Sequence, residues 1–282
     1  MTARGLGIIA GGGELPAAVG DAAREAGRPV FVLALAGSAD AAIAHLPHER
    51  ISIGEPGRAI KALKVHDCAD VLMAGRVARP HWNELKLDAK GVMLLPKVIA
   101  AARHGDDALL RCMVEVFEKE GFGVVGVAEA APGLLAPEGA LGRVKPNDDH
   151  RRDIELAARV VRAMGAFDIG QAAAVCEGLV LAVEAAEGTD AMIARVAGLP
   201  DNLRGHREKP RGVLVKALKP TQDGRTDLPV IGVDTVNNAA AAGLAGIAVE
   251  AGRALLMRRA KIAEAADAAG LFVYGFPRGA YM

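Results

Sequence analysis

The sequence predicts an α/β protein with a Rossmann-like parallel sheet in its N-terminal domain and a second α/β domain after it. Two observations support this fold class. Short apolar runs alternate with longer amphipathic segments along the chain, and a strand-like run leads into three glycines and a helix start in GIIAGGGELP at 7–16. Strands that are apolar on both faces and alternate with helices are typical of a parallel sheet covered on both sides.

The elements of the first domain follow from the apolar runs and their spacing. Continuous apolar runs predict strands at 5–10, 30–35, 69–75 and 122–127. Apolar residues at helical spacing predict helices at 15–26, 58–65 and 107–120. This alternation indicates a doubly wound nucleotide-binding domain over residues 1–132.

The alternation stops at APGLLAPEGALGRVKPNDDH, residues 131–150, where three prolines and three glycines stand. Such a composition favours a linker, which we place at 133–150. A catalytic α/β domain is predicted over 151–282, and an isolated polar Gln171 stands in its first apolar run. We expect its helices at 152–165, after Gly188, at 237–251 and at 254–269, and its strands at 180–184, 212–218, 229–233 and 271–275.

The bulk composition excludes several classes of protein. The 282 residues are 51% hydrophobic and carry 34 basic and 34 acidic side chains, so no general affinity for nucleic acid is expected. Three widely spaced cysteines suggest no disulfide framework, which fits a reducing cytosol. The first apolar run is too short for a secretory signal, and no stretch reaches the roughly 20 apolar residues that span a bilayer. We therefore expect a cytoplasmic protein.

The glycine turn is the first candidate site. A glycine-rich turn before a helix lets backbone N–H groups approach a phosphate or a ribose. Gly11 and Gly13 fit the dinucleotide fingerprint, but its third position falls on Pro16. The second strand ends in LALAGS, without an acid to hold a ribose hydroxyl, which argues against NAD. Another nucleotide, or a tight turn without ligand, stays open.

Charged residues follow several strands and form weaker candidates. Arg76 follows the third strand and could pair with phosphate or be solvated. Asp106 and Asp107 begin a helix, where acids act as caps and dipole partners; we favour this over a cleft or metal role. Thr189 is a plausible helix cap, and its neighbours could bind Mg²⁺ through hard carboxylate oxygens at Glu184, Glu187 and Asp190.

The strongest candidate is VKALKPTQDGRTDLPVIGVDTV at 215–236, a polar loop bracketed by two predicted strands. Basic side chains there can neutralise phosphate, and carboxylates can hold a metal or activate water. The residues concerned are Lys216, Lys219, Asp223, Arg225 and Asp227. This mixture indicates phosphoryl transfer or pyrophosphate hydrolysis, and the alternative is a surface loop with internal ion pairs.

Other catalytic motifs are missing from the sequence. The seven histidines show no HExxH spacing, so zinc is not expected. No GxSxG nucleophile elbow and no GxxxxGK[ST] phosphate loop occurs. The chemistry is therefore expected to depend on fixed charges and a hard metal ion.

Several stretches together resemble the LpxI-type UDP-2,3-diacylglucosamine pyrophosphatases, in order and over almost the whole chain. The most specific are EGTDAM at 187–192 and KPTQDGRTDLP at 219–229; the others are IAGGGELP, MAGRVARP, GDDALLR, DIGQAAAV and GLAGIAVEAG. The GVDTVNNA segment is less typical of that family, at Asp234 and Asn237.

The resemblance implies a Mg²⁺-dependent cytosolic enzyme of lipid A synthesis in a Gram-negative bacterium. It would cut UDP-2,3-diacylglucosamine into 2,3-diacylglucosamine 1-phosphate (lipid X) and UMP, with water directed at the sugar-side phosphorus and the lipid held between two domains. It implies peripheral contact with the inner membrane. A homodimer is expected only from base rates.

The resemblance also implies roles for single residues. Catalytic roles fall on Asp223, Asp227, Arg225, Lys216 and Lys219, and metal binding on Asp223, Asp227 and Asp190. Substrate contacts fall on Gly11, Gly12, Gly13, Arg76, Gln171, Thr189, Asp190 and Thr235. Two alternatives stay open. One is a Rossmann-type oxidoreductase, which would bind nicotinamide. The other is a non-catalytic nucleotide sensor, in which the polar cluster at 215–236 would have no function.

Overall fold

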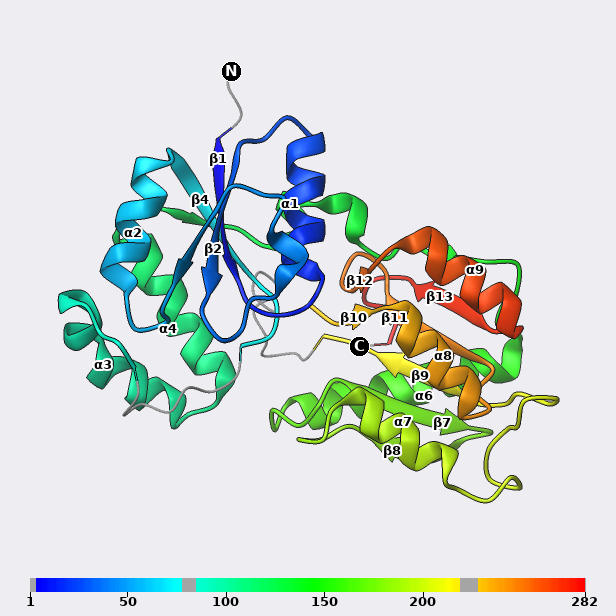
Figure 1. The fold of residues 1–282 in the computed structure, drawn as a ribbon. Coiled ribbons are helices and arrows are strands. Elements are labelled where there is room, and N and C mark those ends of the chain that lie inside the picture. The colour runs from blue at the N-terminus through cyan, green and yellow to red at the C-terminus, as the bar shows by residue number, and fades with distance from the viewer. Residues whose placement is uncertain (1–3, 78–84, 219–227, 282) are drawn as a thin grey trace. The chain divides into compact units, whose positions relative to one another are not determined.

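The computed structural model describes residues 4–77, 85–218 and 228–281. The chain divides into two compact units, which we call the first unit, up to Gly133, and the second unit, from Leu134 (Figure 1). Within the described ranges, no helix is long and apolar enough to cross a membrane.

The first unit contains a five-stranded parallel sheet in the order β3-β2-β1-β4-β5. This order matches the first five of the six strands of a Rossmann fold, 3-2-1-4-5-6, so the predicted fold class is confirmed. The strands are β1 Gly5–Ala10, β2 Val30–Leu35, β3 His48–Ile51, β4 Cys68–Ala74 and β5 Gly123–Val124.

Helices cover both faces of this sheet (Figure 1). Apolar side chains of α2 and α4, among them Leu63 and Phe117, pack with Leu33 and Val71 of the sheet. The helices on this side are α2 Pro56–Val65, α3 Ala89–Ala102 and α4 Asp106–Lys119, and those on the other are α1 Leu15–Glu25 and α5 Val127–Ala130. A short 3₁₀ turn, η1 Ala41–Ile43, follows β2.

Three features of the first unit differ from the prediction. The strand predicted at 122–127 is only β5, because Gly126 already caps α5, which begins at Val127. Strand β3 was not predicted, since HERI at 48–51 is mostly exposed and lacks an apolar run. Helix α3 was missed as well; it contains Pro96 in its interior.

The second unit contains a six-stranded mixed sheet in the order β6-β13-β11-β9-β7-β8. Strands β9, β11 and β13 are parallel, whereas β7 is antiparallel to β8 and β9, and β6 to β13. The strands are β6 Gly139–Ala140, β7 Ala172–Cys176, β8 Leu179–Val183, β9 Val213–Lys216, β11 Gly246–Glu250 and β13 Phe272–Phe276. A separate parallel pair joins β10 Val230–Ile231 to β12 Leu255–Leu256.

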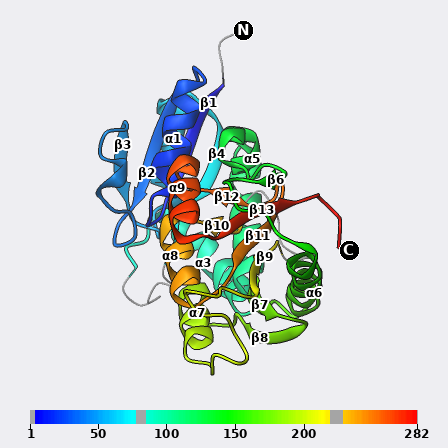
Figure 2. The same ribbon diagram turned by 90° about the vertical axis from the view of Figure 1, so that its right-hand side faces the viewer.

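Figure 2 shows helix α6 on one face of this sheet and α7, α8 and α9 on the other. Val213 and Val215 of β9 pack with α6, and Leu214 between them packs with the residues of α7 to α9. The helices are α6 Asp148–Gly165, α7 Thr189–Ala197, α8 Val233–Ala241 and α9 Arg259–Ala269. A 3₁₀ turn, Pro132–Leu134, stands at the boundary between the units in the chain.

The helix predicted at 237–251 is wrong in its second half. Helix α8 ends at Ala241, Gly243 takes a positive φ of 76°, and the fully buried strand β11 follows at Gly246–Glu250. The segment predicted as one helix is rich in alanine and glycine, so the strand within it, whose five residues are all buried, was not recognised. Similarly, the strand predicted at 229–233 is limited to β10, because Val233 begins α8.

The segment predicted as a linker, 133–150, contributes structure to the second unit. Strand β6 pairs with β13 through residues 139–140. Helix α6 begins at Asp148 behind a capping box, in which Asn147 Oδ1 accepts from the N–H of His150 at 2.8 Å. The acidic first turn and the asparagine cap explain why the helix starts before residue 152.

Candidate functional site

The glycine turn after β1 is tied to the turn after β4. Gly12 and Arg76 exchange two backbone hydrogen bonds of 2.8 and 2.9 Å, and the N–H of Gly11 donates to the carbonyl of Ala74 at 2.8 Å. A Cβ atom on Gly11 would lie 2.5 Å from the Arg76 carbonyl oxygen, and one on Gly75 would lie 2.7 Å from that of Gly12. These glycines are therefore required by the close approach of two backbones.

The third glycine of the turn binds an acidic side chain. The N–H of Gly13 donates to Asp40 Oδ2 at 2.8 Å, and that of Ala42 donates to Oδ1 at 3.0 Å. These N–H groups, that of Ala42 first, lower the pKa of Asp40, and the charge of Arg76 contributes. The turn thus presents a carboxylate, which favours a hydroxyl donor over a phosphate.

Asp40 changes the interpretation of the second strand. We predicted that no acid follows β2, because LALAGS ends without one. Asp40 stands five residues beyond Leu35, the last residue of β2, and η1 follows it with its N-terminus capped by the Asp40 side chain. The signal that could have found it is the Ser-Ala-Asp sequence before a helix start, a capping pattern.

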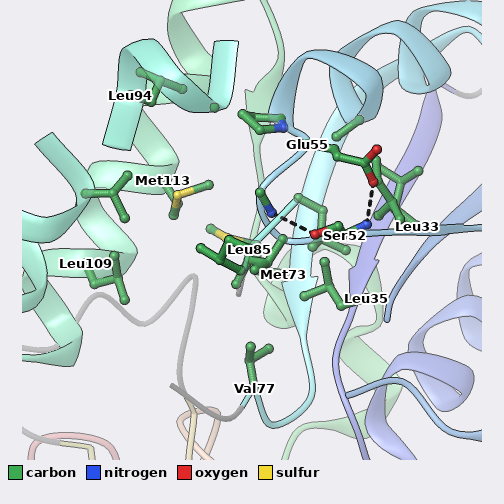
Figure 3. A pocket seen from close by; sticks show the side chains of 18 of the residues that line it. Leu33, Leu35, Ser52, Glu55, Met73, Val77, Leu85, Leu94, Leu109 and Met113 are labelled. Atoms are coloured by element: carbon green, nitrogen blue, oxygen red, sulfur yellow. Dashed lines mark hydrogen bonds between the residues drawn. The ribbon is translucent and has the colours of Figure 1, made fainter. Parts of the chain in front are cut away.

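A cavity of about 350 Å³ lies within the first unit, between the sheet and helices α3 and α4 (Figure 3). Apolar side chains from both sides line it, including Leu33, Leu35 and Met73 from the strands and Leu94, Leu109 and Met113 from the helices. Because α3 was not predicted from the sequence, neither was this cavity.

The cavity reaches the carboxyl edge of the parallel sheet. Leu35 and Ala74, which line it, are the last residues of their strands. Ser52 and Glu55 lie on its wall, and each is held by its neighbours: the N–H of Ser52 donates to Glu55 Oε2 at 2.9 Å, and the N–H of Gly54 donates to Ser52 Oγ at 3.3 Å. Ligands of open parallel sheets bind at this edge.

In the second unit, Lys216 is the last residue of β9, and it is only 6% exposed. Its Nζ donates to the carbonyl of Val230 at 3.2 Å. Lys216 lies level with Ala172 of β7 and Val249 of β11. A buried ammonium group at a strand end therefore marks the edge of the second sheet, where the sequence predicted a phosphate-binding lysine.

Glu184 organises the neighbouring polar cluster. It is 6% exposed, and its Oε1 accepts from Thr189 Oγ1 at 2.8 Å while its Oε2 accepts from the N–H of Gln171 at 2.9 Å. Glu187 pairs with Arg195 instead. Both glutamates are thus engaged by protein groups, so Asp190 is the remaining carboxylate of the predicted trio. Glu184 fixes the start of α7 against the start of β7.

The direction of the Thr189 hydrogen bond limits what its hydroxyl can do. Because Oγ1 donates its proton to Glu184, the lone pairs are left for another partner. Lone pairs can bind a cation or accept from a hydroxyl, but they cannot donate to a phosphate oxygen. The side-chain oxygen of Gln171 is buried and has no hydrogen-bond partner among the described residues.

Asp190 and Thr235 lie on the neighbouring helices α7 and α8. Asp190 is exposed, and its Oδ1 accepts from Asn238 Nδ2 at 3.1 Å. The N–H of Gly232 donates to Thr235 Oγ1 at 3.5 Å, which makes Thr235 part of the α8 cap. The substrate contact predicted for Thr235 stays a prediction.

The rest of the predicted catalytic set, Lys219, Asp223, Arg225 and Asp227, lies outside the described residues. Asp106 and Asp107 occupy the first turn of α4, after Gly105 at its N-cap position. Within residues 4–77, 85–218 and 228–281, no group of three or more His, Cys, Asp and Glu side chains could hold a metal ion. The three cysteines are buried and free, and burial raises the pKa of the Cys68 thiol to about 11.

A Rossmann-type unit followed by a mixed-sheet unit with a polar cluster at a strand edge defines a two-domain α/β protein with candidate sites at both carboxyl edges. The chain belongs to the LpxI family, since the model of the LpxI N-terminal domain matches residues 5–134 and that of the LpxI C-terminal domain matches residues 137–274. It is 51% identical over 272 residues to the UDP-2,3-diacylglucosamine pyrophosphatase LpxI of Caulobacter vibrioides. This alignment covers 96% of the chain and 97% of the relative, so the resemblance noted in the sequence is confirmed.

Proposed function

We propose that this chain hydrolyses the pyrophosphate of UDP-2,3-diacylglucosamine, giving 2,3-diacylglucosamine 1-phosphate and UMP in lipid A biosynthesis. The observation that carries the proposal is the 51% identity to a relative of that name over 97% of the relative's length. The polar clusters at the carboxyl edges of the two sheets supply groups that suit such a substrate.

In the first unit, Asp40 is suited to accept from ribose hydroxyls. Its two oxygens are fixed by N–H groups of Gly13 and Ala42, and each keeps a lone pair for a ligand. Arg76 adds a positive charge near this carboxylate. We therefore assign the glycine turn to the nucleoside rather than to the phosphates.

In the second unit, Lys216 is suited to bind a phosphate oxygen from its buried position. A buried ammonium group acts in a low-dielectric setting, where its attraction for an anion is stronger than in water. The unpaired side-chain oxygen of Gln171 would accept from a ligand donor, which supports its predicted role. These groups would orient the pyrophosphate, and the predicted Asp223 and Asp227 would hold the attacking water.

We propose Mg²⁺ as the cofactor. Thr189 offers lone pairs, and Asp190 has a second oxygen besides the one bonded to Asn238. This donor set fits Mg²⁺, which usually takes one or two carboxylates together with water and substrate phosphates. Asp190, with the predicted Asp223 and Asp227, would hold the ion, which when bound neutralises charge that develops on the phosphate oxygens.

We further propose that the protein works in the cytoplasm and contacts the inner membrane only peripherally. A substrate with two acyl chains resides in a membrane, so a protein that takes it must meet the membrane surface. A homodimer is proposed from base rates alone.

The test is UMP release from UDP-2,3-diacylglucosamine by the purified chain in detergent, with Mg²⁺ and with EDTA. We expect UMP and lipid X in equal amounts with Mg²⁺, and loss of both in EDTA. Binding of substrate without turnover would support the sensor instead. Tight binding of a nicotinamide cofactor would support the oxidoreductase.

A further inference from the structure

The proposed chemistry leaves the cavity of the first unit without a role. Its volume is about 350 Å³, within the range of small-molecule sites. Leu94 of α3 and Leu109 and Met113 of α4 face Leu35 and Met73 of the sheet across it (Figure 3). An apolar space of this size between a sheet and two helices is unusual, because protein interiors are close-packed.

The chemistry of the walls selects the kind of ligand. A nucleobase or sugar would need several convergent polar groups, and the polar side chains on the wall, Ser52 and Glu55, already bind backbone N–H groups. An aliphatic chain needs no such partners. The walls therefore fit a hydrocarbon chain better than either polar part of a nucleotide sugar.

The volume limits how much chain can enter. A water molecule takes about 30 Å³ in the liquid, and a methylene group is of similar size, so the cavity holds on the order of twelve methylene groups. A cavity of this volume suits a single fatty acyl chain. The cavity also reaches the carboxyl edge of the sheet at Leu35 and Ala74, where the glycine turn and Asp40 lie. A chain inside can thus belong to a ligand whose polar part stays at that edge.

We propose that this cavity holds one of the two acyl chains of the diacylglucosamine substrate, while the other chain lies elsewhere. The inference rests on the proposed function, which supplies a substrate with two chains. If the cavity holds an acyl chain, its end wall between α3 and α4 determines the longest chain that the first unit accepts at that position.

The test uses two tryptophan variants of neighbouring residues on α3. Leu94→Trp places a large ring in the cavity, whereas Met93 is 76% exposed and does not line it, so Met93→Trp is the matched control. Leu94→Ala enlarges the cavity and serves as the second probe if the tryptophan variant unfolds. Folding of each full-length variant is checked by its thermal melting curve.

The measurement is kcat/KM for UMP release with substrates whose two acyl chains are shortened together from 14 to 6 carbons, at a fixed mole fraction in detergent micelles. For the wild type and Met93→Trp, we expect kcat/KM to rise with chain length over the lengths that the cavity accommodates. The rise should be smaller than the roughly fourfold per methylene of transfer from water, because the micelle already shields the chains. Leu94→Trp should keep wild-type kcat/KM for the shortest chains and lose the rise several carbons earlier. Leu94→Ala should shift the limit to longer chains.

If both Leu94 variants follow the wild-type dependence on chain length while hydrolysis persists, the cavity does not hold an acyl chain and the inference is overturned. Failure of the wild type to hydrolyse substrates of any length would instead refute the proposed function. The two failures are therefore distinguishable in one set of assays.

Discussion

Replacing Glu184 tests the arrangement of the second site most closely. Its buried carboxylate accepts from the hydroxyl of Thr189 at 2.8 Å and from the N–H of Gln171 at 2.9 Å. Glu184→Ala removes both acceptors. Glu184→Gln keeps the shape, and its amide oxygen can still accept from Gln171, but its NH₂ group must donate to Thr189. The hydrogen bond to Thr189 then runs in the opposite direction.

The magnitudes of the two changes differ. A buried donor left without a partner costs about 1–3 kcal/mol, so Glu184→Ala, which strands two donors, should lower the free energy of unfolding by about 3 kcal/mol. Glu184→Gln keeps both contacts and should cost about 1 kcal/mol or less. In Glu184→Gln, the hydroxyl proton of Thr189 also points away from residue 184. It then occupies the side on which the lone pairs of Thr189 would otherwise bind the metal ion. Loss of such an outer-shell partner typically lowers activity 10–100-fold, and we expect about that loss in Glu184→Gln.

Urea unfolding followed by circular dichroism and UMP release at several Mg²⁺ concentrations measure the two effects separately. Glu187→Gln is the matched control, because Glu187 pairs with Arg195 at the surface and should leave activity unchanged. A Glu184→Gln protein with wild-type activity at every Mg²⁺ concentration would refute the role given to the Thr189 lone pairs.

Two further predictions concern stability. Arg162 is largely buried and pairs at 3.4 Å with Glu250, which is 1% exposed. Arg162→Met should lower the free energy of unfolding by about 2 kcal/mol in urea titrations, because the buried carboxylate loses its nearer cation and keeps Arg253 at 4.0 Å; an unchanged midpoint would contradict this. Burial lowers the pKa of His150, outweighing the charges of Asp153 and Asp149, so its protonation favours the unfolded chain. The stability that neutral His150 contributes is present above its ordinary pKa of about 6.5 and is lost as pH falls through the lowered pKa of the folded state. In His150→Gln, the free energy of unfolding should therefore depend less on pH between pH 7 and 5. A pH profile identical to that of the wild type would refute this prediction.

Strands β1, β2 and β4 of the first unit could be predicted because they are continuous apolar runs. VFVLAL and GLGIIA have buried neighbours on both faces, so each apolar run marks a strand without a period of two. Strand β11 could not be predicted in the same way. Its Gly-Ile-Ala-Val-Glu sequence follows an alanine-rich helix with the break at Gly243, and small residues suit both a buried strand and a helix.

The sites show a similar division. The sequence indicated which loops carry polar residues, and the structure brings Gln171 and Thr189 to one carboxylate, Glu184. The sequence could not show that the Glu184 carboxylate is already bound by groups of the protein, because hydrogen bonds between separate segments leave no local pattern. Asp40 had a local signal in its capping pattern before η1, but its contact with Gly13 could not be predicted, since it joins residues 27 positions apart. The cavity depends on α3, whose pattern was not recognised.

We expect pyrophosphate hydrolysis to depend on the KPTQDGRTDLP segment at 219–229. The most direct measurement is the rate of UMP release with Mg²⁺ by the wild type, Asp223→Ala and Asp227→Ala, with each protein shown to be folded. We predict that at least one aspartate variant loses activity by about 100-fold or more, as when a charged group that stabilises a transition state is removed. Wild-type rates in both variants would contradict the claim.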